Sequence, residues 1–207
     1  MLVTIPAQCD LDEAGSFLDR HLVWVRERLD SLPLPVPFVD GAVMPLRGEP
    51  HRVVVDDAAK MIVTRERKGG KWREIVVPGP AASAAARLRD WLFEEARRDL
   101  KERVALHTRR FGLAAKRIAV RDQTSRWGSC STTGVLSFSW RLVLAPPYVL
   151  DYVAAHEAAH LAEMNHGPRF WALVKKMIPE FEVSKTWLKA LGSELHRYGA
   201  AAARASG

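Results

Sequence analysis

The residues that most restrict how this chain can fold lie between Tyr148 and Trp171, in the segment YVLDYVAAHEAAHLAEMNHGPRFW. Its centre reads H-E-x-x-H, with His156 and His160 four positions apart. At about 100° per residue, a helix brings these two side chains to one face, about 40° apart and one turn apart along the axis. The segment therefore predicts a helix that presents two imidazoles to one metal ion.

Glu157 follows the first histidine, and its position suits the chemistry of a metal site. Its carboxylate would lie beside a water molecule on the metal and could take a proton from it. Zn²⁺ lowers the pKa of a bound water to about 7, so hydroxide becomes available near neutral pH. Since a catalytic zinc site has three protein ligands and one open position, a third ligand is expected elsewhere in the chain.

His166, six residues after the second histidine, is our first choice for this third ligand. On a continuous helix it would point about 120° away from the metal-binding face, so the helix must end first. Asn165 and Gly167 tolerate a left-handed backbone, and Pro168 disfavours helix at the residue before it. The sequence thus predicts a turn over residues 164–167 that returns His166 to the metal. The aromatic residues that follow this turn are expected to pack it onto the metal helix.

Other ligands compete with His166. Glu163 shares a helix face with His156 but lies about 10 Å further along the axis, which is too far for one ion. Three later carboxylates stay open, because some zinc hydrolases take their third ligand from a later helix: Glu180, Glu182 and Glu194. The motif fixes only three of five positions, so chance matches occur. However, the surrounding helix is apolar and rich in alanine, where unpaired His and Glu would be costly to bury.

A second polar segment, DQTSRWGSCSTTG at residues 122–134, lies between predicted strands at 116–121 and 135–140. A strand beside the metal could bind an extended substrate through its backbone. Arg126 of this segment could hold an anionic group or a developing oxyanion, and Tyr152 of the metal helix is a further candidate for the oxyanion. The alternative for Arg126 is an ion pair with a carboxylate.

The rest of the chain predicts a mixed α and β protein. An amphipathic helix is expected at residues 12–30, and short β-prone runs over residues 36–79 indicate a β meander. We therefore expect a strand, helix and β-meander region at 1–80, a metal-binding region at 81–199 and a disordered tail at 200–207.

Composition narrows the class of protein. The chain has 207 residues, 48% hydrophobic and 27% charged, as in soluble globular proteins. A net charge of +7 permits a nucleic-acid or nucleotide partner without establishing one. The two cysteines, Cys9 and Cys130, fit a reducing cytoplasm rather than a disulfide framework. No membrane association is expected, because no run approaches about 18 apolar residues, and the N-terminus shows no secretory signal.

Three motifs together resemble the YgjP-like metallopeptidase family, which is related to SprT-like zincins: RWGSC at 126–130, HEAAH at 156–160 and NHGPRFW at 165–171. The resemblance implies an α+β fold of the minimal zincin type. In this fold an antiparallel or mixed sheet accompanies the H-E-x-x-H helix, and a small β-rich region precedes it. Family members usually begin with a basic strand pair before the segment that matches LVTIP. This chain lacks that pair, so either Met1 is an internal start or the β region is reduced.

The resemblance also implies roles for single residues. Glu157 corresponds to the general base, and the zinc ligands correspond to His156, His160 and His166. The segment at 126–130 is implied to line or support the cleft, through Arg126, Trp127 and Ser129. Ala158 and Ala159 fill the two middle positions of the HEAAH motif. The family often has a larger residue at the first of these positions, and this difference should affect packing rather than chemistry.

Three functions fit these features. The leading one is a zinc-dependent hydrolase, a metallopeptidase in which Glu157 activates a zinc-bound water to cleave a peptide or protein substrate. The second is a metal-dependent hydrolase of nucleotides or other phosphoanhydrides, although the carboxylate cluster typical of Mg²⁺-dependent enzymes is missing. The third is a DNA-associated protease or a non-enzymatic zinc-containing binding module. Structural zinc sites are closed, and the absence of an obvious fourth ligand argues against such a module.

Overall fold

The computed structural model describes residues 5, 8–30, 33–66, 69 and 72–200. The predicted disordered tail lies outside these residues, apart from residue 200. Contacts divide the chain into two compact units, Met1–Leu34 and Pro35–Gly207. Both sides of the boundary that we expect at residues 80 and 81 lie in the second unit, and that boundary stays a prediction.

The first unit contains the helix α1 (Leu11–Asp30), which confirms the amphipathic helix expected here. Asp10 precedes it, and the Oδ1 atom of Asp10 accepts a hydrogen bond from the backbone N–H of Asp12 at 3.1 Å. A side-chain acceptor at this position satisfies one of the free N–H groups of the first turn. The helix therefore begins where the sequence supplies a cap.

The second unit opens with a sheet whose strand order is β1-β2-β4-β3. The strands are β1 (Val43–Leu46), β2 (Glu49–Asp56), β3 (Val63–Arg65) and β4 (Arg73–Pro78). The pairs β1–β2 and β3–β4 are antiparallel, but β2 and β4 are parallel. The predicted β meander is therefore wrong, since a meander pairs each strand with the next in an antiparallel way.

Burial explains this strand order. Residues 74–77 of β4 are all buried, whereas all three residues of β3 are exposed. A continuous buried run is typical of a central strand with both faces covered, and an exposed strand suits an edge. β4 therefore lies inside the sheet beside β2, and the chain places β3 on the outside.

A two-residue turn, Arg47 and Gly48, joins β1 to β2, and both residues have positive φ angles, of 51° and 79°. Such angles are typical of the tight hairpin turns that match the twist of the strands. The turn docks on the segment before the metal helix, because its two N–H groups donate to the carbonyls of Val143 and Leu144 at 2.7 and 3.1 Å. A Cβ at Gly48 would lie 3.0 Å from the Cα of Pro146.

Gly48→Ala is therefore expected to lower the free energy of unfolding by about 2–3 kcal/mol, from left-handed strain and from the contact with Pro146. Gly41→Ala is the matched control, since its φ is 78° but nothing lies within 4 Å of its Cβ position. The free energy of unfolding of that variant should fall by only about 1 kcal/mol, from the left-handed strain alone. Urea unfolding of both variants measures the difference, and equal losses would contradict the proposed contact.

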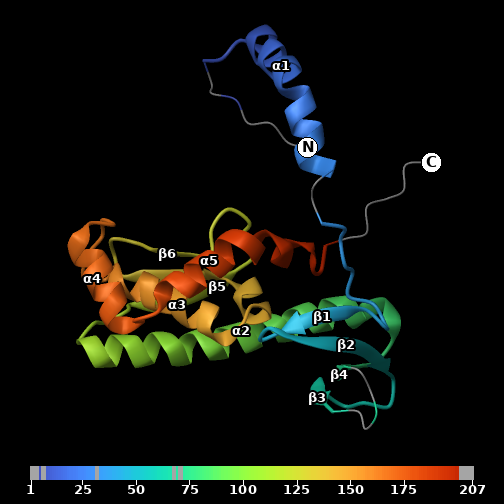
Figure 1. Cartoon of the computed structure of the whole chain (residues 1–207). Coiled ribbons are helices and arrows are strands. Elements are labelled where there is room, and N and C mark those ends of the chain that lie inside the picture. The colour runs from blue at the N-terminus through green and yellow to red at the C-terminus, as the bar shows by residue number, and fades with distance from the viewer. Residues whose placement is uncertain (1–4, 6–7, 31–32, 67–68, 70–71, 201–207) are drawn as a thin grey trace. The chain divides into compact units, whose positions relative to one another are not determined.

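The long helix α2 (Ala81–Phe111) follows and connects the two sheets. Its buried residues recur every three or four positions, including Leu88, Leu92, Leu100 and Val104, and Gly112 ends it with a φ of 64°. Figure 1 shows α2 reaching from the first sheet to a position below the helix α3. Three later elements pack against this long helix: β5 (Arg117–Arg121), the short helix η1 (Trp140–Leu144) and α3 (Pro147–Ala159).

The second sheet contains β5 (Arg117–Arg121), β6 (Gly128–Cys130) and β7 (Val135–Ser139) in the order β5-β7-β6. β5 is parallel and β6 antiparallel to β7. The remaining elements are the short helix η1 (Trp140–Leu144), α3 (Pro147–Ala159), α4 (Pro168–Met177), α5 (Phe181–Leu191) and η2 (Gly192–Arg197). The predicted α+β class with mixed sheets is confirmed. Within the described part of the chain, no helix is long and apolar enough to cross a membrane.

Candidate metal centre

The helix α3 carries the H-E-x-x-H motif and is packed on several sides. It begins at Pro147, which suits a first helical position because it has no N–H group to satisfy. It contacts α2, α4, α5 and β6. Ala154, Ala155, Ala158 and Ala159 are fully buried on it. These small side chains allow close packing around the motif, which holds the helix in a fixed position.

The chain leaves the helix before the turn that the sequence predicts at residues 164–167. α3 ends at Ala159, with His160 as its C-cap, and the next helix starts at Pro168. The prediction that the helix ends before His166 is confirmed. Neither Asn165 nor Gly167 uses the left-handed backbone that it tolerates, because neither has a positive φ. The turn is instead closed by short backbone hydrogen bonds, such as Gly167 N–H to the Asn165 carbonyl at 2.7 Å.

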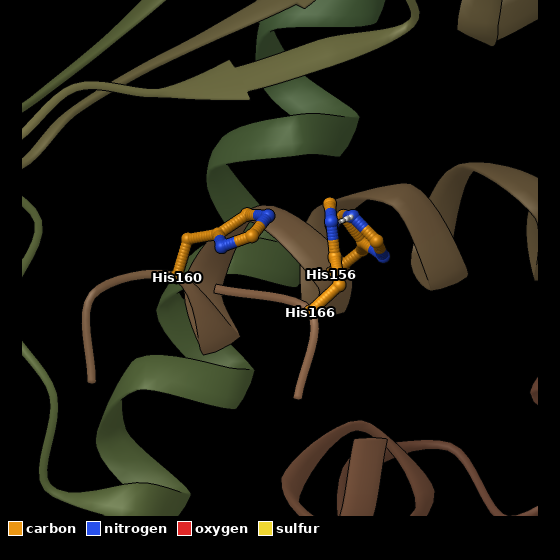
Figure 2. A group of neighbouring side chains, drawn as sticks. All are labelled: His156, His160 and His166. Atoms are coloured by element: carbon orange, nitrogen blue, oxygen red, sulfur yellow. Dashed lines mark hydrogen bonds between the residues drawn. The ribbon is translucent and has the colours of Figure 1, made fainter. Parts of the chain in front are cut away.

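This turn brings the three predicted histidine ligands together. One nitrogen from each of His156, His160 and His166 lies within 4.8 Å of the others. The Nε2 atoms of His156 and His166 are 3.1 Å apart, and Figure 2 shows their rings against each other, with His160 beside them at the end of α3. Tetrahedral zinc with Zn–N bonds of about 2.0–2.1 Å needs roughly 3.3 Å between ligand atoms. The three nitrogens therefore fit one such ion after small movements.

The surroundings favour neutral imidazoles, which is the form that binds metals. Burial, together with the charges of His160, His166 and Lys185, lowers the pKa of His156 to about 4. Burial also lowers the pKa of His160, whose Nδ1 lies 3.1 Å from the backbone carbonyl of Glu163. A carbonyl at this nitrogen accepts its proton and leaves Nε2 for the metal.

Aromatic side chains of α4 hold the histidine rings. Phe170 is fully buried and stacks on His160 with ring centres 4.5 Å apart. Trp171 stacks on His166 at 5.7 Å. The predicted packing of these aromatic residues against the turn is confirmed. Because the rings are fixed from one side, the ligand geometry does not depend on the loop alone.

Three of the four competing carboxylates pair with basic side chains. The side chain of Glu163 lies 3.5 Å from Arg169, while Glu182 and Glu194 pair with Lys185 and Arg197. Among the residues that the structure describes, no carboxylate joins the histidine group. Glu163 thus contributes its backbone carbonyl rather than its side chain, which the sequence pattern could not indicate.

Glu157 lies next to this group and is only 6% exposed. Burial raises the pKa of its carboxyl group to about 7, and the nearby charge of Arg126 opposes this rise. Arg126 itself is exposed on the loop before β6. The structure therefore brings Arg126 near the predicted base, where its charge acts on the carboxylate.

Tyr152 lies one turn before His156 on α3, and the two rings make an edge contact at 5.8 Å. Its ring also stacks on Phe181 of α5 at 6.2 Å. Burial, followed by the charges of Glu182 and Glu157, raises the pKa of Tyr152 to about 12. The hydroxyl group therefore keeps its proton and remains a hydrogen-bond donor near the histidines.

A pocket of about 180 Å³ is lined by His156 and Glu157. It lies between β6, α3 and α5, and its apolar lining comes from Trp127, Val153 and Leu188. Trp127 stacks on His196 at 5.1 Å, and a Cβ at Gly192 would lie 3.2 Å from the Trp127 ring. The contribution of α5 to this pocket is a feature that the sequence analysis missed, because helical periodicity alone does not show which element a helix faces.

Comparison with known proteins identifies the family of this chain. The model of the family described as YgjP-like, metallopeptidase domain, matches residues 1–191. No curated protein matches the chain. Two similar solved structures are metallopeptidase zymogens: abylysin of Pyrococcus abyssi and jannalysin of Methanocaldococcus jannaschii.

Abylysin is 19% identical with a TM-score of 0.41, and the match covers 49% of this chain and 99% of that chain. Jannalysin is 20% identical with a TM-score of 0.39, and the match covers 45% of this chain and 88% of that chain. The family match spans far more of the sequence, from the N-terminal segment through the histidine cluster to α5. On this match, the chain belongs to the YgjP-like family of metallopeptidase domains.

Proposed function

We propose that this metallopeptidase holds one zinc ion on His156, His160 and His166 and uses Glu157 as its general base. The observation that supports this most is the convergence of three imidazoles, with one nitrogen of each within 4.8 Å of the others, beside a buried carboxylate. When bound, zinc supplies Lewis-acid polarisation of the scissile carbonyl and makes water nucleophilic at neutral pH. Glu157 takes a proton from the attacking water and passes it to the leaving amine.

Two further side chains are proposed to stabilise the oxyanion that forms in this reaction. Tyr152, whose pKa is raised to about 12, is protonated at neutral pH, so it can donate a hydrogen bond as negative charge develops. Arg126, on the loop before β6, adds positive charge that acts on Glu157. Tyr152 is buried on the packed helix α3, which favours a donor that is in place before the substrate binds.

The open edge of β6 is the proposed binding surface for the substrate backbone. The backbone N–H of Ser139 donates a hydrogen bond to the carbonyl of Trp127 at 2.9 Å, so these two residues form a hydrogen-bonded pair. Along an antiparallel ladder, such pairs alternate with pairs whose N–H and C=O groups point away from the partner strand. The N–H and C=O groups of Gly128 and Cys130 therefore point away from β7. Since β6 is the edge strand of its sheet, an extended peptide can pair with these groups beside Glu157.

N-methylation of single peptide bonds in a cleaved substrate tests this surface. Each methyl group removes one N–H donor, and a lost hydrogen bond corresponds to about 0.5–1.5 kcal/mol. We expect kcat/KM to fall by roughly threefold to tenfold at alternate positions on one side of the scissile bond, because successive residues of a strand face opposite ways. A uniform effect at neighbouring positions would contradict strand pairing.

The function itself is tested with casein and a peptide library, each with and without a metal chelator. Cleavage that stops on chelation and returns with zinc supports the proposal. Nucleotides serve as the second substrate panel, since the net charge of +7 leaves a nucleotide or nucleic-acid partner as a prediction. A cytoplasmic location belongs to the same proposal, because Cys9 and Cys130 are both free thiols.

A further inference from the structure

Gly128 of β6 lies against the carboxylate of Glu157. A methyl group on Gly128 would be 2.6 Å from both Cγ and Oε1 of Glu157, and 2.9 Å from Cδ. These distances are well below ordinary van der Waals contact, so the space that an alanine side chain would fill is taken by Glu157. Gly128 is opposite Phe138, which is fully buried, on the face of the sheet that meets the helices.

The backbone of Gly128 does not itself require glycine. Its φ is outside the left-handed region, unlike the φ angles of Gly41, Gly48 and Gly134. An ordinary strand residue would adopt its conformation without strain. The neighbouring carboxylate is therefore the reason that a side chain is excluded at this position.

We propose that Gly128 is a positioning residue for Glu157: its bare Cα lets the carboxylate lie against the β6 backbone, beside the histidines. The inference rests on the proposed role of Glu157 as general base. The added methyl group would meet Cγ of Glu157 as well as its carboxylate, so the whole side chain of Glu157 must turn away from β6 to make room for it. The adjoining pocket of about 180 Å³ offers the space into which it would turn.

Gly128→Ala tests this role by kinetics. A displacement of about 1 Å can lower a rate by about 10²-fold, so we expect kcat to fall by about 10–100-fold, with KM changed less than about threefold. The metal content should stay near one ion per chain, because the three histidines are untouched. Gly15→Ala in α1 is the matched control, since nothing lies within 4 Å of the added methyl group there. Unchanged kcat in Gly128→Ala would overturn the proposal.

Two further measurements need no activity, so they separate this proposal from the proposed function. In protein labelled with ¹³C at glutamate Cδ, the Glu157 resonance is identified by its loss in Glu157→Gln. It should move in Gly128→Ala and stay in place in Gly15→Ala. A resonance that stays in place in both variants would overturn the proposal even if wild type cleaves no peptide.

Thermal unfolding covers the case in which Gly128→Ala folds poorly. If the added methyl group collides with Glu157, removal of that side chain must relieve the loss of stability. The double variant Gly128→Ala, Glu157→Ala should then melt within about 2 °C of Glu157→Ala. The reason is that the effects of two substitutions on stability do not add when the two residues are in contact. Equal losses of stability in both backgrounds would mean that β6 needs glycine for its own conformation, and the proposal would be overturned.

Discussion

Glu157→Gln is expected to lower kcat for peptide cleavage by about 10²–10⁴-fold while the chain still binds about one metal ion. Glutamine keeps the size of the side chain but cannot take a proton from water. The histidine cluster is untouched, and the amide suits the buried position of Glu157, which is 6% exposed. Metal analysis and steady-state kinetics on the same sample measure both parts of the prediction.

Glu102→Gln provides the control for this change. Glu102 lies on the exposed surface of α2, 3.9 Å from Arg103, and has no part in the proposed site. The same chemical substitution there should leave kcat and metal content as in wild type. Full activity in Glu157→Gln would show that another group accepts the proton.

His166→Ala is expected to remove the metal, with bound zinc falling from about one ion per chain to below about a tenth. Two imidazoles on one helix turn remain, and zinc sites in proteins take at least three protein ligands. His166 lies on an exposed turn, so the fold should persist without its ring. Peptide cleavage should disappear together with the metal.

Thermal unfolding with added zinc gives an independent measurement of His166→Ala. A ligand at 100 times its dissociation constant stabilises the folded state by about 2.7 kcal/mol. Zinc should therefore raise the melting temperature of wild type and of the control His21→Ala, which changes an exposed residue of α1. It should not raise that of His166→Ala, and an equal rise would place the ion elsewhere.

The local part of the site could be predicted from the sequence because its causes are local. Helical spacing fixes His156 and His160 on one face, and Pro168 limits how far a helix can extend. The way in which the turn is built could not be predicted. Asn165 and Gly167 can adopt a left-handed backbone, but hydrogen bonds within the turn make it unnecessary.

Features that depend on distant segments were missed for a physical reason. The sequence pattern of residues 36–79 indicates where strands begin and end. The order of the strands in the sheet, however, depends on which strand is covered on both faces. Only packing reveals that residues 74–77 are central and buried. In the same way, the sequence contains Gly128 within RWGSC, but its contact with Glu157 depends on how β6 lies against α3.

The most direct measurement is a zinc titration of chelated wild-type protein, with bound zinc and peptide cleavage followed in one sample. The proposed site predicts that cleavage returns in proportion to bound zinc and reaches its maximum at one ion per chain. Cleavage that persists in the chelated protein, or a chain that binds no zinc, would contradict a zinc peptidase built on His156, His160 and His166.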